Sequence, residues 1–354
     1  MPVNLRSTST LLLNQPMEFQ NDFTRITGTK YPLVMAPMFL VSNPEMVKSA
    51  IRSGILGCFP SLNFRDRGKL GVVLQDLNEF RAAHPGGSYG VNLIVQQSNP
   101  LSKEHLDICV AHKVPVYITS LGNPTATIEA AHSYGAVVFC DVTNLTHAEK
   151  CYAAGCDGFV AVGQGAGGHA GPYPTQLLVG SLRKHFPDRP VLAAGGIADG
   201  QGILGALAAG ASAAYCGTRF IASSESTVST EYIQAILDAG MGDIVMTDRI
   251  SGTPCTIINT PFAQRIGLHQ NRLQRFLGKN PRTRKYYKML VQQRGFKWLE
   301  KATQPGNYNN LWCAGQSVEL IDKVASVEEI VRTMVREMES AYRQLEVQFG
   351  RQDQ

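Results

Sequence analysis

The sequence lacks the patterns that mark membrane spans, secretion and metal sites. No apolar run reaches the roughly 18 residues that a membrane-spanning helix requires. The run Leu11-Leu12-Leu13 is too short for the apolar part of a secretory signal. None of the eight cysteines lies in a CxxC pair, and the histidines share no ligand spacing with acids. We therefore expect a soluble, cytoplasmic protein with reduced thiols, no bound metal and no membrane partner.

Several catalytic signatures are also absent. There is no P-loop, no GxSxG nucleophile turn and no paired-carboxylate spacing. What the chain does have is 354 residues, 44% of them hydrophobic and 17% charged. This composition supports a large core and argues against disorder. The length suits one barrel domain with an additional segment.

Positive charge is concentrated in one segment. Residues 265–301 hold eleven Lys and Arg against one acid, Glu300, so this segment carries +10 and the rest of the +5 chain carries −5. Such a segment could face nucleic acid, an anionic cofactor or an acidic partner protein, or it could be the solvated face of a helical insertion. No nucleic-acid motif accompanies it, so we favour the solvated face and expect no nucleic-acid partner.

A repeating unit predicts the fold. Helical patterns end in glycine and are followed by continuous apolar runs, as in Gly135-Ala136-Val137-Val138-Phe139-Cys140, which indicates parallel strands buried on both faces. The expected strands are 32–38, 54–60, 88–95, 115–120, 136–141, 157–162, 190–194 and 213–217. The expected helices are 44–53, 66–83, 102–112, 124–134, 145–154, 175–185, 200–209 and 228–239.

Eight strand–helix repeats predict a (β/α)8 TIM barrel. The alternative is a Rossmann-like open sheet, but its GxGxxG is missing after the first strand, where Ala36-Pro37-Met38 stands. We expect residues 25–240 and a closing segment, 318–350, to form the barrel. Residues 241–317 are expected to form a basic, mostly helical insertion at the barrel mouth. Apolar residues at helical spacing predict a closing helix over 326–349.

Working residues of a TIM barrel sit at the carboxyl ends of its strands. The sixth predicted strand ends in Gly163–Gly171, which holds five glycines and one titratable side chain, His169. Such a loop suits a flat or phosphorylated ligand and a residue that moves one proton, although a surface glycine loop is the plainer interpretation. Gly195-Gly196 and Gly217-Thr218 follow the seventh and eighth strands, where such barrels often bind phosphate. Two ordinary tight turns would give the same pattern.

Taken in order, the strand ends resemble the nitronate monooxygenase family. The resemblance runs from about residue 31 to 318 and rests on Ala36-Pro37-Met38, Gly90-Val91-Asn92-Leu93, Gly165–Gly171, Ala194–Ile197, Gly217–Phe220 and Trp312–Gln316. It implies an FMN-binding TIM barrel that oxidises alkyl nitronates with O2 to a carbonyl compound and nitrite. It also implies that His169 is the catalytic base. The cofactor-binding residues that we expect are Ala36, Pro37, Met38, Asn92, Asp141, Gly167, Gly168, Gly195, Gly196, Gly217, Thr218 and Gln316.

Two other functions stay open. FMN-dependent enoyl-acyl-carrier-protein reductases, which use NAD(P)H, share part of this resemblance, and residues 265–301 would suit NAD(P)H or an acidic carrier protein. Enoyl thioesters or quinones would then be the substrates. A flavin-binding partner module without turnover is a third interpretation. Asp141 departs from the lysine that many family members carry near the end of strand five, and its charge could alter the flavin's reactivity. The sequence is compatible with an oligomer.

Overall fold

The computed structural model describes residues 17–66, 68–250, 253–270 and 311–350, with 287, 289–291, 294–295 and 297–298 between them. Eight strands, each followed along the chain by helical structure, form the repeating unit of the described residues. In order, the elements up to the end of the sixth barrel strand are α2 (Asp22–Thr27), β1 (Leu33–Met35), α3 (Pro44–Arg52), β2 (Leu56–Pro60), η1 (Ser61–Asn63), α4 (Lys69–Ala83), β3 (Ser88–Ile94), α5 (Ser102–Ala111), β4 (Val116–Ser120), α6 (Thr125–His132), β5 (Val137–Val142), α7 (Leu145–Ala153) and β6 (Gly158–Val162). The later elements are β7 (Gly168–His169), α8 (Thr175–His185), β8 (Val191–Ala194), α9 (Gly200–Ala208), β9 (Ala213–Cys216), α10 (Thr218–Ile221), α11 (Thr230–Asp238), η2 (Met241–Asp243), β10 (Ile244–Thr247), β11 (Cys255–Ile258), α12 (Pro261–Ile266), η3 (Gln316–Leu320) and α15 (Val327–Gln348).

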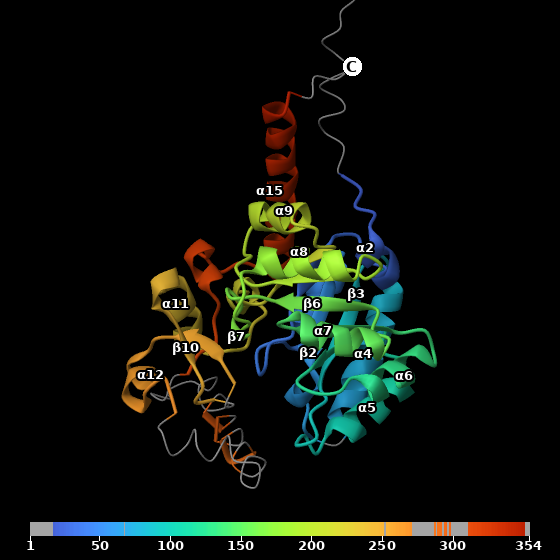
Figure 1. Ribbon diagram of the computed structural model, residues 1–354, viewed down its shortest axis with the longest axis vertical. Helices are drawn as coiled ribbons and strands as arrows, with labels where there is room; N and C mark the ends of the chain where they lie inside the picture. The colour runs from blue at the N-terminus through green and yellow to red at the C-terminus, as the bar shows by residue number, and fades with distance from the viewer. Residues whose placement is uncertain are drawn as a thin grey trace, which may run out of the picture.

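Eight parallel strands close into a barrel in the order β1-β2-β3-β4-β5-β6-β8-β9. The barrel closes where β1 pairs with β9, with Leu33 opposite Ala214. Figure 1 shows the helices arranged around the strands. The (β/α)8 prediction is therefore confirmed, and the open Rossmann-like sheet is excluded by the closing pair. Closure also brings the carboxyl ends of all eight strands to one rim.

The strands are buried on both faces, as their continuous apolar runs predicted. One apolar cluster fills the barrel interior, with Val34, Ile118 and Phe139 among its members. A second, larger cluster lies between the strands and the surrounding helices, and it includes Met35, Tyr117 and Val179. Neighbouring strand residues contribute to opposite clusters because side chains alternate across a sheet.

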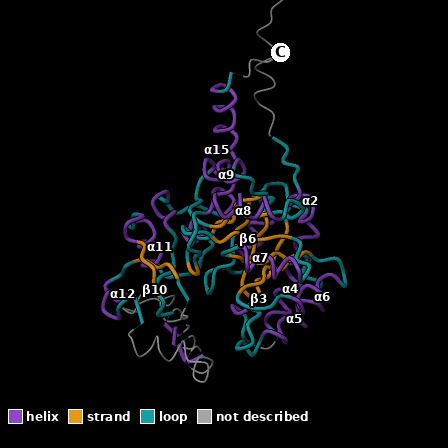
Figure 2. Tube along the Cα trace, in the orientation of Figure 1, coloured by secondary structure: helices purple, strands orange, loops and turns teal. Residues whose placement is uncertain are grey.

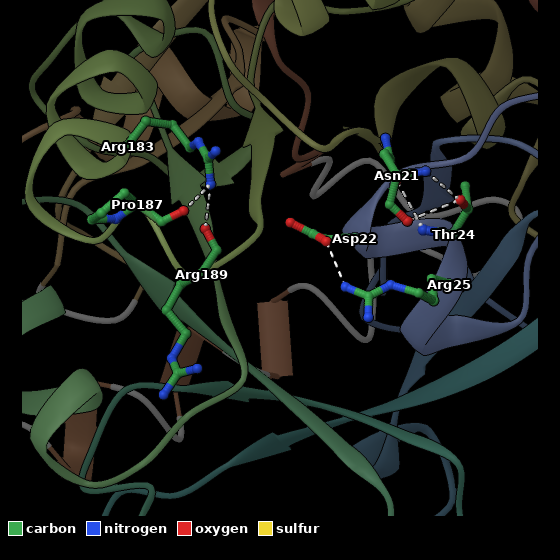
Figure 3. A network of polar contacts seen from close by, with 7 residues as sticks. All are labelled: Asn21, Asp22, Thr24, Arg25, Arg183, Pro187 and Arg189. Atoms are coloured by element: carbon green, nitrogen blue, oxygen red, sulfur yellow. Dashed lines mark hydrogen bonds and ion pairs between the residues drawn. The ribbon is translucent and has the colours of Figure 1, made fainter.

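Helix α2 covers the amino-terminal end of the barrel. The Asn21 side chain accepts a hydrogen bond from the Thr24 amide at 3.0 Å, and the Thr24 hydroxyl accepts one from the Asn21 amide. Asn21 Nδ2 also donates to the Ser212 carbonyl, just before β9, at 2.7 Å. Figure 3 shows this capping box, together with Arg183 donating to the Pro187 and Arg189 carbonyls before β8. These contacts stabilise the end of the barrel opposite the carboxyl rim.

Helix α15 packs on α9 and α3. It begins after Ser326, whose hydroxyl accepts from the Glu329 amide at 3.1 Å, in agreement with the predicted closing helix. Its stripe is buried from Val327 to Met338, but Leu345 is exposed. The carboxyl-terminal half of the helix extends beyond the barrel (Figure 1), so it has no core to contact. Only the amino-terminal part of the predicted helix therefore packs on the core.

A second sheet lies beside the barrel. Strands β10 and β11 pair antiparallel, and β11 pairs antiparallel with β7. Figure 2 shows β10 apart from the barrel strands. The described part of the predicted insertion thus contains strands that helical patterns did not predict, beside the helices α12 and η3. Most of the basic segment 265–301 falls outside the described residues, so its predicted helical form stays a prediction. No helix in the described ranges has the length and apolarity to cross a membrane.

Replacing Phe23 by Ala should destabilise the barrel by about 3–5 kcal/mol, because the ring is fully enclosed and packs 6.0 Å from the Phe139 ring. Arg25→Ala is the matched control on the same helix. It removes only an exposed ion pair with Asp22, so it should cost no more than about 1 kcal/mol. Urea unfolding followed by far-UV circular dichroism measures both. Equal unfolding midpoints for the two variants would show that α2 does not close the barrel.

Candidate functional site

A row of polar side chains crosses three neighbouring strands at the carboxyl rim. Asn92 of β3 donates from Nδ2 to the Ser120 hydroxyl at 2.7 Å and to the Ile118 carbonyl at 3.1 Å. Ser120, the last residue of β4, donates to Asp141 Oδ2 of β5 at 2.5 Å. Asn92 and Ile118 are register partners, and Ile118 belongs to the barrel interior. The row therefore forms a polar layer inside the mouth, above the apolar interior.

Asp141 is the charged member of this row. Its Oδ1 is enclosed and has no hydrogen-bond partner among the described residues. Burial raises the pKa of its carboxyl to about 6, and the hydrogen bond from Ser120 only partly opposes this. No ion pair within the described part of the chain involves Asp141. A carboxylate of this kind indicates a functional site rather than a stabilising contact.

The turn after β1 lies against the turn after β9. A methyl group added at Gly217 would lie 3.7 Å from Ala36 Cβ and 3.8 Å from Met38 Sδ. The Ala36 amide already donates to the Cys216 carbonyl at 2.8 Å, and the Met38 amide donates to the Ser42 hydroxyl at 2.9 Å. Pro37, between them, has no amide hydrogen. This turn therefore has side chains and carbonyl oxygens, but not these N–H groups, to offer a ligand.

The glycines of the Gly163–Gly171 loop are packed against two other segments. A methyl group at Gly167 would lie 2.7 Å from the Gly315 nitrogen and 3.1 Å from Thr218 Oγ1. One at Gly195 would lie 2.7 Å from the Ala166 nitrogen. Both distances are too short for a real side chain. Gly195 and Gly196 also have positive φ, +121° and +77°, which favours glycine. Close backbone packing alone therefore explains why positions 167 and 195 are glycine.

Thr218 retains a free donor. Its Oγ1 accepts from the Gly315 amide at 3.0 Å, which leaves the hydroxyl hydrogen for another acceptor. The Gly196 amide, by contrast, donates to the Gly165 carbonyl at 3.2 Å. Beside these residues lies a cavity of about 420 Å³ whose lining includes Gly195, Gly196 and Gln316. Three of the expected cofactor-binding residues therefore border one cavity, at the end of β8.

His169 is held by the second sheet. It lies in β7, opposite Cys255 of β11, while Gly168 pairs with Thr256. Thr256 Oγ1 also donates to the Ala166 carbonyl at 2.5 Å. Figure 1 shows β7 between the barrel strand β6 and the strand β10. The His169 residue is exposed at the loop surface, yet the protein around it removes enough water to lower the pKa of the imidazole. The ring is therefore neutral and basic at pH 7.

The structure adds two residues to the predicted set. Ser120 orients Asp141, and Thr256 fixes the loop that carries His169. Ser120 could have been found, because it ends a predicted strand next to the strand of Asp141. Thr256 gave no such signal, since it lies in the segment that was expected to be helical. No cluster suited to a metal ion occurs within the residues described.

One protein family matches most of the chain, and its similar relatives carry several names. The family described as nitronate monooxygenase matches residues 20–337. A probable nitronate monooxygenase of Staphylococcus saprophyticus is 27% identical over 361 residues, covering 87% of this chain and 97% of that protein. A (3aS,4S,5R,7aS)-5-hydroxy-7a-methyl-1-oxo-octahydro-1H-indene-4-carboxyl-CoA dehydrogenase of Mycobacterium tuberculosis is 28% identical over 252 residues, covering 71% of this chain and 69% of that protein. The solved structure of FabK from Thermotoga maritima superposes with a TM-score of 0.77 and 27% identity, covering 93% of this chain and 99% of that one.

Replacing Asp141 by Asn should stabilise the cofactor-free protein at pH 7 to 8 by about 3 kcal/mol, since the pKa is raised from 3.8 to about 6 and one pKa unit corresponds to about 1.4 kcal/mol. The raised pKa means that the folded protein binds more protons than the unfolded chain between pH 4 and 6. Wild-type stability therefore falls as the pH rises through this window, and the variant lacks that loss. The difference should vanish below about pH 4, where both side chains are neutral.

Urea unfolding at a series of pH values measures this difference. Asp107→Asn, at an exposed carboxylate of α5, is the matched control and should follow the wild type. A pH-independent difference between Asp141→Asn and the wild type would contradict the burial of the charge.

Proposed function

The chain belongs to the nitronate monooxygenase family, and from this premise we propose that it oxidises alkyl nitronates with O2 to a carbonyl compound and nitrite. The family makes it a flavin-dependent oxidoreductase. The observation that carries the proposal is the pairing of β7 with β11, which holds a neutral imidazole on the loop after β6. This loop rises from the same rim as the Asn92, Ser120 and Asp141 row.

FMN is the flavin that we propose. The residues that would hold it fit such a group on three grounds. Asp141 Oδ1 is an enclosed oxygen with no partner in the described part of the chain, Thr218 retains a hydroxyl donor for phosphate, and Gly217 leaves space against Ala36 and Met38. Gly195, Gly196 and Gln316 border the adjoining cavity. We place Asn92, Gly167 and Gly168 beside the ring. When bound, FMN would supply the electron transfer between the organic substrate and O2.

His169 would act as the proton acceptor. A neutral imidazole accepts the proton from the carbon next to a nitro group, which converts a nitroalkane into its nitronate. Because burial lowers the pKa of His169, this base form is already present below the usual imidazole range. The activity towards nitroalkanes should therefore rise with pH through a pKa below the ordinary value for histidine. A substrate that is already a nitronate does not require this step.

A second candidate is an NAD(P)H-dependent FMN reductase of enoyl thioesters or quinones. One observation favours it: a relative with 28% identity is named for a carboxyl-CoA substrate, which is a thioester. NAD(P)H, CoA and acidic carrier proteins are all anionic, and the segment 265–301 is strongly basic. A flavin-binding module without turnover would retain the site but would accept electrons from neither a nitronate nor NAD(P)H.

Replacing His169 by Asn should lower O2 consumption with neutral nitroethane by about 100-fold or more, since positioned bases contribute about 10²–10⁴-fold. O2 consumption with ethyl nitronate should change far less, because that substrate has already lost its proton. His185→Asn, at an exposed histidine of α8, is the control and should match the wild type with both substrates. An oxygen electrode measures all three proteins.

Anaerobic mixing of the flavin-containing protein with each electron donor distinguishes the competing functions. Bleaching of the yellow protein by ethyl nitronate, and not by NADH or NADPH, supports the proposal. Bleaching by NADH or NADPH alone would favour the reductase. A flavin that neither donor reduces would favour the non-catalytic module, and an equal loss of both activities in His169→Asn would remove His169 as a base.

A further inference from the structure

Asp141 faces the barrel mouth, and no residue that the structure describes supplies it with a counter-charge. Cys58 of β2 and Tyr215 of β9 are the titratable groups that interact with it from the other strands. Burial raises the pKa of the Cys58 thiol and of the Tyr215 phenol, so both are neutral at pH 7. Ser120 is the hydrogen-bond donor that the structure gives to this carboxylate. Among these groups, Asp141 alone changes its charge near neutral pH.

The direction of the hydrogen bonds limits what the row can offer. Asn92 Nδ2 donates to the Ile118 carbonyl. Because a carbonyl oxygen can only accept, this contact fixes the orientation of the Asn92 amide. Its other hydrogen goes to Ser120, and the Ser120 hydrogen goes to Asp141 Oδ2. All the donors of Asn92 and Ser120 are therefore used. The one proton that this row can present to a ligand is a proton on Asp141 Oδ1.

The ring of oxidised FMN presents acceptors, namely carbonyl oxygens and unprotonated ring nitrogens, whereas the reduced ring carries additional N–H groups. An ionised carboxylate would repel the acceptor edge and attract the N–H edge. We propose that Asp141 binds the oxidised ring as the neutral acid, with Oδ1–H donating to the ring, and passes this proton to the ring on reduction. This inference rests on the proposed FMN site.

The proton transfer balances within the site. The Oδ1–H bond of Asp141 breaks, a ring N–H bond forms, and the electrons come from the organic substrate. Asp141 would be left as a carboxylate that accepts a hydrogen bond from the new N–H, and it would regain this same proton from the ring when O2 takes up the electrons. Asp141 thereby couples the charge of the mouth to the oxidation state of the cofactor.

The electrostatics of the empty mouth support the direction of this coupling. Burial already raises the pKa of Asp141 to about 6. A flat ring over the mouth would remove further water from around the half-buried Asp141 residue and raise the pKa of its carboxyl again. At pH 7 the carboxyl is mostly ionised before FMN binds and would become protonated afterwards. Binding of oxidised FMN should therefore take up a proton from solution.

Calorimetric titration of the FMN-free protein at pH 7, in two buffers with different ionisation enthalpies, counts this proton. The wild type should take up as much as one proton more than Asp141→Asn. The FMN phosphate also titrates near this pH, but it contributes equally to both proteins. Asp107→Asn should match the wild type. Ser120→Ala keeps the carboxyl but removes the Oδ2 donor that stabilises its ionised form, so this variant should take up less of a proton than the wild type.

Equal proton uptake by the wild type and Asp141→Asn, with FMN bound by both, overturns this inference and leaves the proposed cofactor intact. Uptake that occurs only when ethyl nitronate is added to the FMN complex also overturns it, because Asp141 would then face the substrate. Failure of the wild type to bind FMN would instead remove the proposed cofactor. Far-UV circular dichroism of each variant confirms that it has folded.

Discussion

The pairing of β7 with β11 is the contact on which the site depends. It joins the loop after the sixth barrel strand to a segment about 90 residues later in the chain, with His169 opposite Cys255. β11 is itself held by the segment before Gln316, because the Ile258 amide donates to the Trp312 carbonyl at 2.9 Å. Tyr232 of α11 then donates to the Cys313 carbonyl at 2.6 Å. The barrel positions the polar row, and this second sheet positions the histidine.

The glycines of the site have a structural role that does not depend on a bound cofactor. Gly167 and Gly315 lie so close that a methyl group on either would meet the backbone of the other at 2.8 Å or less. This contact brings the Gly163–Gly171 loop, the Thr218 hydroxyl and the turn of Gln316 together. The same glycines that resemble a cofactor loop are therefore also the joint between the barrel and the insertion. Gly217 differs, because a methyl group added there would have no contact shorter than 3.7 Å.

The barrel could be predicted from the sequence because its signals are local. Several strands are continuous apolar runs after a glycine, and the helix predicted over 44–53 is observed as α3 at Pro44–Arg52. The second sheet could not be predicted in this way. β7 has only two residues, and both lie in a glycine-rich loop. Its partner β11 is far away in the chain. Only tertiary contact makes such a segment a strand.

The sequence selected candidate residues, but it did not predict the hydrogen bonds between them. Strand ends selected Asn92 and Asp141, yet the order Asn92–Ser120–Asp141 depends on the register of β3, β4 and β5. The unpartnered Oδ1 of Asp141 is likewise a property of the packed barrel. Local sequence carries neither the register nor the enclosure, because both are set when the sheet closes.

The central claim is that the carboxyl rim binds FMN, with its phosphate at Gly217 and Thr218. Titration of the FMN-free protein with FMN, followed by flavin fluorescence, tests this most directly when Gly217→Ala is compared with the wild type. The variant should keep the wild-type unfolding midpoint, since its methyl group meets only ordinary contacts, and should bind FMN at least about tenfold more weakly, a loss of about 1.4 kcal/mol. Gly180→Ala on α8, where a methyl group meets nothing, should bind FMN like the wild type. Equal FMN affinity of Gly217→Ala and the wild type, or no FMN binding by either, would contradict the account.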